Sequence, residues 1–166
     1  MPTGPAARIS DMVAHPAPPV LTGGPTATTV LIGYLPAWRG VGPAAAAALQ
    51  SAKAVSDAAI KTAEAATLAA AGTPGAPAAK AAEETVKATA AAAMGSMISG
   101  AAAGTDIHTC TTPLPIPPHG PGVVITPSAT VMVQGMPAAR MGDTILEAVG
   151  PPNTITKGEP TVIIGG

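Results

Sequence analysis

The chain has 166 residues, a formal net charge of −1 and only 10% charged residues. This length allows one domain and is too short for two large ones. With no Phe, one Trp and one Tyr, the core cannot be aromatic. The weak net charge and the absence of a basic patch argue against nucleic acid as a partner.

Gly and Pro punctuate the chain from end to end, with 19 Gly and 20 Pro. Such a content is typical of low-complexity sequence. The mean hydropathy of +0.39, however, is higher than disordered chains usually reach. We therefore expect a mainly β fold in which short strands are joined by tight turns.

Cys110 is the single cysteine, so it excludes an intramolecular disulfide and suits a reducing compartment or a metal site. The N-terminal segment has no apolar stretch of the kind found in signal peptides. We expect cytoplasmic assembly, and any export must follow a route without a signal peptide.

A short motif recurs three times. Residues 5–11 read Pro-Ala-Ala-Arg-Ile-Ser-Asp, residues 137–143 read Pro-Ala-Ala-Arg-Met-Gly-Asp, and residues 36–39 read Pro-Ala-Trp-Arg without the Asp. A Thr-Val-aliphatic run alternates with it, at 29–33, 130–135 and 161–165. Each run predicts a strand followed by a turn, which gives a three-fold pattern in one chain.

The second copy is interrupted by an alanine-rich segment, 41–104. Removing it joins Gly40 to Thr105 and restores the missing acid as Asp106. We expect these residues to hold the repeats together through turns and ion pairs: Pro5, Ala6, Ala7, Arg8, Asp11, Pro36, Arg39, Asp106, Pro137, Ala138, Ala139, Arg140 and Asp143. The chain thus divides into a discontinuous β domain, 1–40 plus 105–166, and an insertion, 41–104.

The insertion is predicted to form two antiparallel helices, at about 43–71 and 78–102, because alanine has the highest helix propensity. The break lies at the Gly- and Pro-rich stretch 72–77. Charged residues follow one stripe on each helix, and opposite charges at three- and four-residue spacing stabilise a helix. A membrane-active segment is the alternative for 88–104, although only Ile98 there belongs to the strongly inserting residue types.

Three histidines and the cysteine, His15, His108, Cys110 and His119, follow the repeat motifs. They form a complete tetrahedral set for one structural zinc ion, and a small core without aromatics needs such a staple. The alternative is that they are ordinary turn histidines and a buried thiol. A Cys–His catalytic pair lacks any supporting local motif, so we expect no catalytic residue.

The three motif pairs resemble the PAAR-repeat proteins of type VI secretion and related contractile injection systems. The resemblance covers nearly all of 1–40 and 105–166. It implies a small pseudo-three-fold cone whose base caps a trimeric VgrG-type spike and whose vertex holds zinc through His15, His108, Cys110 and His119.

The resemblance also implies a function, that of a non-enzymatic tip that sharpens the spike for membrane puncture and is exported with it to the outside or into a target cell. Membrane contact is then transient. We expect the insertion 41–104 to recruit an effector or a chaperone, or to brace the side of the spike. The alternatives are a membrane-active secreted effector and a zinc-dependent hydrolase.

Two features depart from the family pattern. Trp38 replaces the second Ala of the middle motif, and residues 143–147 contain neither Cys nor His. The third repeat is therefore expected to offer no ligand. The helical insertion is absent from the simplest family members.

Overall fold

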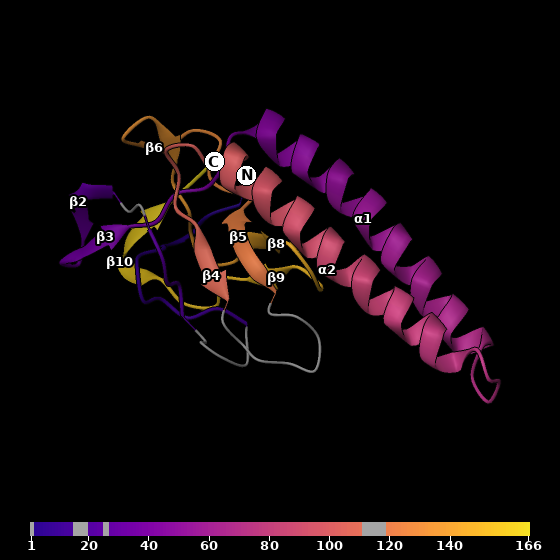
Figure 1. The fold of residues 1–166 in the computed structure, drawn as a ribbon. Helices are drawn as coiled ribbons and strands as arrows, with labels where there is room; N and C mark the ends of the chain where they lie inside the picture. Colours follow the sequence, from indigo (N-terminus) through magenta and orange to yellow (C-terminus); the bar gives the residue numbers. More distant parts are fainter. Residues whose placement is uncertain (1, 15–19, 25–26, 111–118) are drawn as a thin grey trace.

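The computed structural model describes residues 2–14, 20–24, 27–110 and 119–166, and Figure 1 shows its fold. The prediction of a mainly β fold with a helical insertion is confirmed. The elements are β1 (Gly4–Ala6), β2 (Ala27–Ile32), β3 (Leu35–Ala37), α1 (Pro43–Ala69), α2 (Ala76–Ala101), β4 (His108–Cys110), β5 (Gly120–Val124), β6 (Met132–Val133), β7 (Met136–Pro137), β8 (Thr144–Glu147), β9 (Asn153–Thr154) and β10 (Glu159–Ile164).

Each repeat contributes one two-stranded antiparallel sheet, and the three sheets are β1–β10, β2–β3 and β6–β7. In each sheet, a strand from the Pro-Ala motif pairs with a strand from a Thr-Val run. The three sheets gather at one end of the molecule, on the left in Figure 1. We call this end the base, and we call the described parts of 1–40 and 105–166 the cone.

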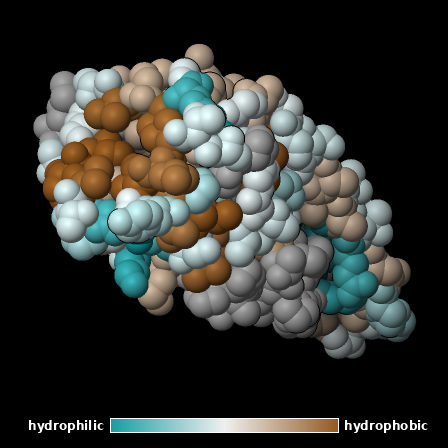
Figure 2. Space-filling view, turned by 90° about the vertical axis from the view of Figure 1, so that its left-hand side faces the viewer, coloured by the Kyte–Doolittle hydropathy of each residue, from teal (hydrophilic) through white to brown (hydrophobic). Residues whose placement is uncertain are grey.

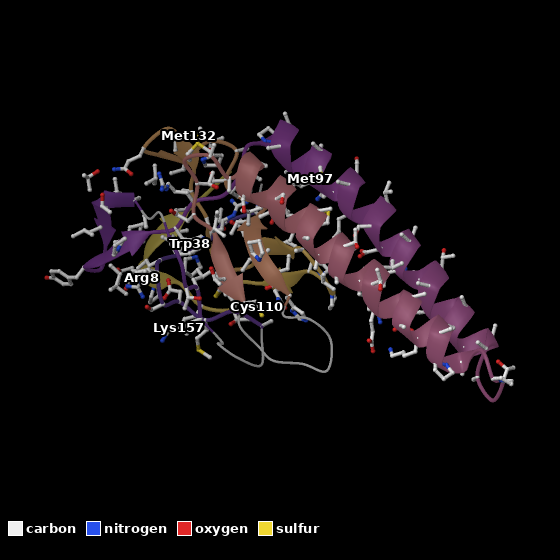
Figure 3. All side chains as sticks on the ribbon, in the orientation of Figure 1. Arg8, Trp38, Met97, Cys110, Met132 and Lys157 are labelled. Carbon is white, nitrogen blue, oxygen red and sulfur yellow. The ribbon has the colours of Figure 1, made fainter. Side chains whose placement is uncertain are left out.

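The three repeats meet around a pseudo-three-fold axis, where equivalent residues bond in a closed cycle. The N–H of Ala7 donates to the carbonyl of Ala139 (2.9 Å), that of Ala139 to Trp38 (2.9 Å), and that of Trp38 to Ala7 (2.8 Å). All three side chains are fully buried in one cluster. Since equivalent side chains converge there, one large residue fills the space beside two small ones, which explains the Trp (Figure 3).

An Arg–Asp pair closes each repeat. The backbone N–H of the Arg donates to the carboxylate of the Asp at 2.8 Å in all three cases, and the guanidinium pairs with the same carboxylate. The pairs are Arg8 with Asp11, Arg39 with Asp106, and Arg140 with Asp143. Asp106 therefore occupies the place of the missing acid in the second repeat, although 67 residues separate it from Arg39.

The second and third pairs are deeply buried. Burial raises the pKa of the Asp106 carboxyl above its ordinary value, and the hydrogen bonds and charge of Arg39 offset part of that effect. Asp143 behaves in the same way beside Arg140. A buried acid of this kind is tolerated only with its partner, because an unpaired buried charge is strongly destabilising.

A four-stranded antiparallel sheet, in the order β4-β5-β8-β9, connects the base to the insertion. Helix α2 packs on β5 and β8. The shared core contains Leu49 of α1, Met94 and Ile98 of α2, and Val123 and Leu146 of the sheet. Aliphatic side chains and Met thus form the core that the composition required.

The insertion forms an antiparallel hairpin of α1 and α2, within two residues of the expected bounds. It extends away from the base towards the lower right of Figure 1. Lys87 of α2 bonds Glu64 of α1 (2.7 Å) and Glu83 (2.6 Å), which fixes the alignment of the two helices. Among the described residues, no helix is sufficiently long and apolar to span a bilayer.

Candidate functional site

The register of the four-stranded sheet brings two polar side chains together on one face. His108 of β4 lies opposite Gly122 of β5, and Gly122 lies opposite Glu147 of β8. The glycine between them has no side chain, so Nε2 of His108 and Oε1 of Glu147 approach to 3.7 Å. A Cβ on Gly122 would stand 2.9 Å from Cγ of Glu147. The sheet has room for this pair only because Gly122 is a glycine.

Glu147 also contacts His119, which precedes β5. Its Oε2 lies 2.7 Å from Nδ1 of His119, and its side chain is 0% exposed. The sulfur of Cys110 completes a compact group, since one ligand atom from each of Cys110, His119 and Glu147 lies within 4.8 Å of the others. Cys110 is the last residue of β4, and Figure 3 labels it.

A second glycine positions the imidazole of His119. Gly150 has φ of +87°, which favours glycine, and a Cβ there would lie 3.1 Å from Nε2 of His119. The backbone of Gly150 therefore supports the flat face of the ring. Val149 donates its N–H to the carbonyl of His119 (3.1 Å) and fixes the same segment.

The structure places three of the four expected ligands. It brings Cys110 and His119 together, and His108 adjoins them through Glu147. Nδ1 of His108 accepts a weak hydrogen bond from the N–H of Thr22 at 3.4 Å. His15 lies outside the described residues.

Glu147 is the residue that the sequence reasoning missed, because it searched the third repeat only for Cys and His. The spacing of the repeats identifies it. His15 follows Asp11 by four residues, Cys110 follows Asp106 by four, and Glu147 follows Asp143 by four. The three-fold pattern therefore assigns a ligand-type side chain to each repeat, and the third repeat carries a carboxylate.

A sulfur, an imidazole nitrogen and a carboxylate oxygen are all accepted ligands of zinc. Cys110 and Glu147 are buried, and the His119 side chain is only 12% exposed. This burial and the close grouping fit a structural ion better than a catalytic one, since catalytic sites keep a position open to substrate. The residues present thus fit a metal ion, and Cys110, His119 and Glu147 could hold it.

The base presents a second candidate site, an apolar surface. Leu31, Met132 and Ile163 hold the same position in the three Thr-Val runs and are 58%, 55% and 60% exposed. We call them the apolar triad. Figure 2 looks onto this side of the molecule and shows a broad hydrophobic area on it. Their strand neighbours, such as Val133 and Ile164, are buried in the cone, as the alternation of a strand requires.

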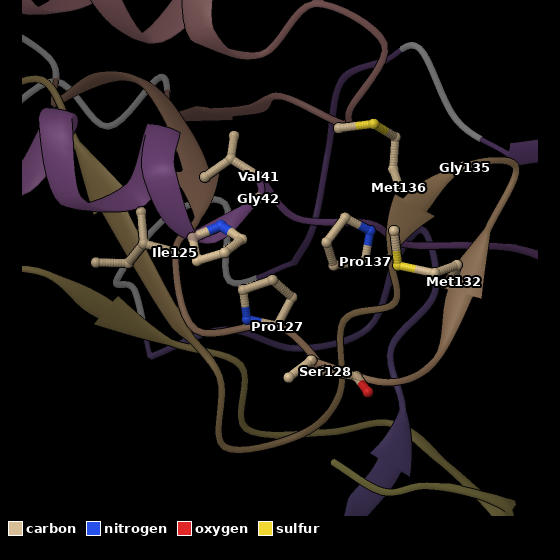
Figure 4. Close-up of a pocket in the computed structure, with 11 residues that line it drawn as sticks. Val41, Gly42, Ile125, Pro127, Ser128, Met132, Gly135, Met136 and Pro137 are labelled. Carbon is tan, nitrogen blue, oxygen red and sulfur yellow. The ribbon is translucent and has the colours of Figure 1, made fainter.

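Two hollows lie elsewhere on the surface, one near the base and one on the helical hairpin. One, of about 310 Å³, opens beside Met132 between β6–β7, Pro127 and the start of α1 (Figure 4). The other, of about 560 Å³, follows the groove between α1 and α2, where Val55, Val86 and Met97 line it and no charged side chain does.

Comparison with known proteins gives one family. Residues 115–166 match the family model described as PAAR motif. No curated protein and no solved structure matches the chain. The PAAR family is a structural spike-tip family associated with VgrG-type proteins. The match falls on the third repeat, and the other two repeats share its Arg–Asp pair and its place around the axis. Residues 115–166 therefore carry a PAAR motif, and this match supports a PAAR-repeat protein of type VI secretion and related contractile injection systems.

Proposed function

We propose that the base caps a trimeric VgrG-type spike and that the protein is the non-enzymatic point of that spike. The observation that carries the proposal is the apolar triad, three equivalent side chains with nearly equal exposure. A trimer presents three identical surfaces at its end. One chain with three-fold symmetry can meet all three at once, without three copies of itself.

Burial of the triad supplies affinity. Burying one side chain of this size gives about 1.5–3 kcal/mol relative to leaving it exposed. The cost of association absorbs part of that gain. Burial of three such side chains in one interface nevertheless favours docking, because in the free protein they are exposed to water.

The test is binding of the purified protein to a VgrG-type trimer from the same genome. We expect one chain for each trimer, and Leu31→Asp to weaken binding at least tenfold, since a charge would be buried at the interface. Val55→Asp is the matched control and should bind the trimer normally, because Val55 is 73% exposed and lies in the groove between α1 and α2, away from the base. Equal binding by both variants would contradict docking through the base.

We further propose that one zinc ion stabilises the cone, held by Cys110, His119 and Glu147 with His108 beside them. His15, the ligand expected from the first repeat, remains a candidate for the same ion. Such an ion would tie β4, the start of β5 and the end of β8 together. A stiff vertex would then transmit force to a membrane during puncture.

Elemental analysis of purified protein tests the zinc proposal. We expect one zinc for each chain, and a lower zinc content in Cys110→Ser and in Glu147→Gln. Glu64→Gln, a change of the same type on α1, should retain the full content. Protein purified in the presence of zinc but free of metal would overturn the proposal.

The helical hairpin is proposed to recruit an effector or a chaperone. The uncharged groove beside Val55 and Met97 is suited to an apolar helix, which would complete a three-helix arrangement. Deleting 41–104 places Arg39 and Asp106 three residues apart, as in the other repeats, so the cone should still fold. Unchanged effector delivery by this deletion variant would contradict the recruitment role.

Export on the spike completes the proposal. The protein would assemble in the cytoplasm and leave the cell with the spike. Detection of the protein outside cells with an intact contractile system, and its retention in cells that lack the sheath, would test this route.

A further inference from the structure

Tyr34 combines a strained backbone with an almost fully exposed side chain. It is 94% exposed, and its backbone φ is +68°, in the left-handed region that bulky side chains rarely adopt. It is also the only tyrosine of the chain. A strained residue at an exposed position indicates a role beyond folding, because the fold alone would favour a different residue there.

The equivalent turn of the third repeat shows what the fold alone favours. The β6–β7 turn contains Gln134 and Gly135, with φ of +49° and +77°. The β2–β3 turn contains Gly33 and Tyr34 at the same two places, so Tyr34 stands where the other repeat has a glycine. Positive φ at both central residues defines the tight hairpin turn for which Gly is the preferred second residue.

The neighbouring glycine has a local reason that Tyr34 lacks. A Cβ on Gly33 would stand 2.7 Å from Nη1 of Arg8 and 2.8 Å from Oε2 of Glu159. Crowding by this ion pair, together with the positive φ of +54°, therefore favours glycine at the first place. The ring of Tyr34 projects outward from the second place, and its high exposure leaves almost all of its surface available to a partner.

Tyr34 lies three residues from Leu31 of the apolar triad, at the end of the same hairpin. We propose that Tyr34 is the anchor residue of the base, inserting its ring into an apolar pocket at the end of the trimeric spike. This inference rests on the proposed function. Buried tyrosines are over-represented among residues that dominate binding energy, because a large rigid ring loses little conformational freedom.

The anchor breaks the symmetry of the interface. The trimer offers three identical pockets, whereas the three corners of the base differ. One corner carries Tyr34, one carries Gln134 and Gly135, and the third is formed by the β1–β10 sheet near Gly4 and Ile164. One pocket therefore receives the ring. The tip binds in any of three equivalent orientations, each with a single aromatic contact.

The experiment compares Tyr34→Gly, Tyr34→Phe and Val55→Ala for binding to the VgrG-type trimer and for thermal unfolding. Tyr34→Gly should raise the Kd at least tenfold and raise the Tm by about 2–4 °C, because it relieves the backbone strain. Tyr34→Phe keeps the ring and should bind within about threefold of the unchanged protein. Val55→Ala controls for the loss of an exposed apolar side chain elsewhere.

The outcomes separate the two proposals. If Tyr34→Gly binds as well as the unchanged protein while Leu31→Asp does not, the base docks but Tyr34 is not its anchor. If the unchanged protein fails to bind the trimer, the proposed function falls and this inference falls with it. If Tyr34→Gly loses binding to vesicles of mixed neutral and anionic lipid but not to the trimer, the ring contacts a membrane and the inference is wrong.

Discussion

In the cone, many bonded partners lie far apart in the sequence, whereas in the helical hairpin most of them are neighbours. Arg8 pairs with Glu159 across 151 residues, while Lys53 pairs with Asp57 across four. The hairpin can therefore form from local contacts, and its two antiparallel helices return the chain to the point where it left the cone. This explains how a long insertion is accommodated inside a repeat without disturbing the pair that closes it.

Asp106→Ala should produce the largest loss of stability, because it breaks the ion pair of the cone at the point where the insertion interrupts the repeat. It leaves the buried guanidinium of Arg39 without its carboxylate, and breaking a buried pair costs about 3–5 kcal/mol. Asp11→Ala should cost less, since Arg8 keeps Glu159 at 2.6 Å. Denaturant unfolding of both variants measures the difference, and equal losses would show that the second pair is no more critical than the first.

Removal of a bound metal ion should have the second-largest effect, and it should destabilise the cone before the hairpin. If zinc stands at 100 times its Kd, its loss lowers the free energy of unfolding by about 2.7 kcal/mol. Chelation should therefore lower the Tm in the unchanged protein and have little effect in Glu147→Gln. A chelator that lowers both equally would indicate that the ion, if present, does not use Glu147.

Gly150→Ala is expected to have a smaller effect, and Gly142→Ala is its matched control. Both glycines have positive φ, of +87° and +93°, but only a Cβ on Gly150 meets His119, while a Cβ on Gly142 meets nothing within 4 Å. Strain of about 1 kcal/mol is common to both. Only Gly150→Ala should also weaken zinc binding, by about tenfold, as measured by competition with a chromogenic chelator.

The smallest effect should be seen in acid, and the two regions should respond with opposite sign. Hydrogen bonds from Lys80 and Lys87 lower the pKa of Glu83 in the hairpin to about 2. Its folded pKa is below the unfolded value, so its contribution is complete above about pH 4.5 and disappears as the pH falls towards 2.

In the cone, burial raises the pKa of Asp106, so a lower pH relieves the penalty of its buried charge. The test uses Glu83→Gln, which removes the ionised carboxylate from the hairpin. The difference in the free energy of unfolding between the unchanged protein and Glu83→Gln should vanish as the pH falls from 4.5 to 2. A difference that persists at pH 2 would contradict the assignment to the ionised Glu83.

The sequence predicted the features that repeat. Three copies of the motif identified the family and a mainly β fold, and excision of 41–104 located the partner of Arg39. Alanine content and the Gly72–Pro77 break located two helices. These inferences succeeded because each depends on local composition or on comparison of one repeat with another.

The remaining features required three-dimensional placement. The contact of Glu147 with His119 depends on strand register across β5, and on Gly122 leaving space for it. The near-equal exposure of the apolar triad depends on which face each strand turns to the core. The strain at Tyr34 depends on a backbone angle, and Gly-Tyr is not the sequence usually associated with such a turn.

Gly4 pairs with Ile164 in the β1–β10 sheet, so the two termini leave the cone side by side (Figure 1). A label placed beside this sheet would lie next to the surface that is proposed to dock on the spike. The turn at 70–75, at the far end of the hairpin, is the better place for a label. A circular permutant with its ends joined by a short linker and its chain opened at that turn should keep every strand pairing of the cone.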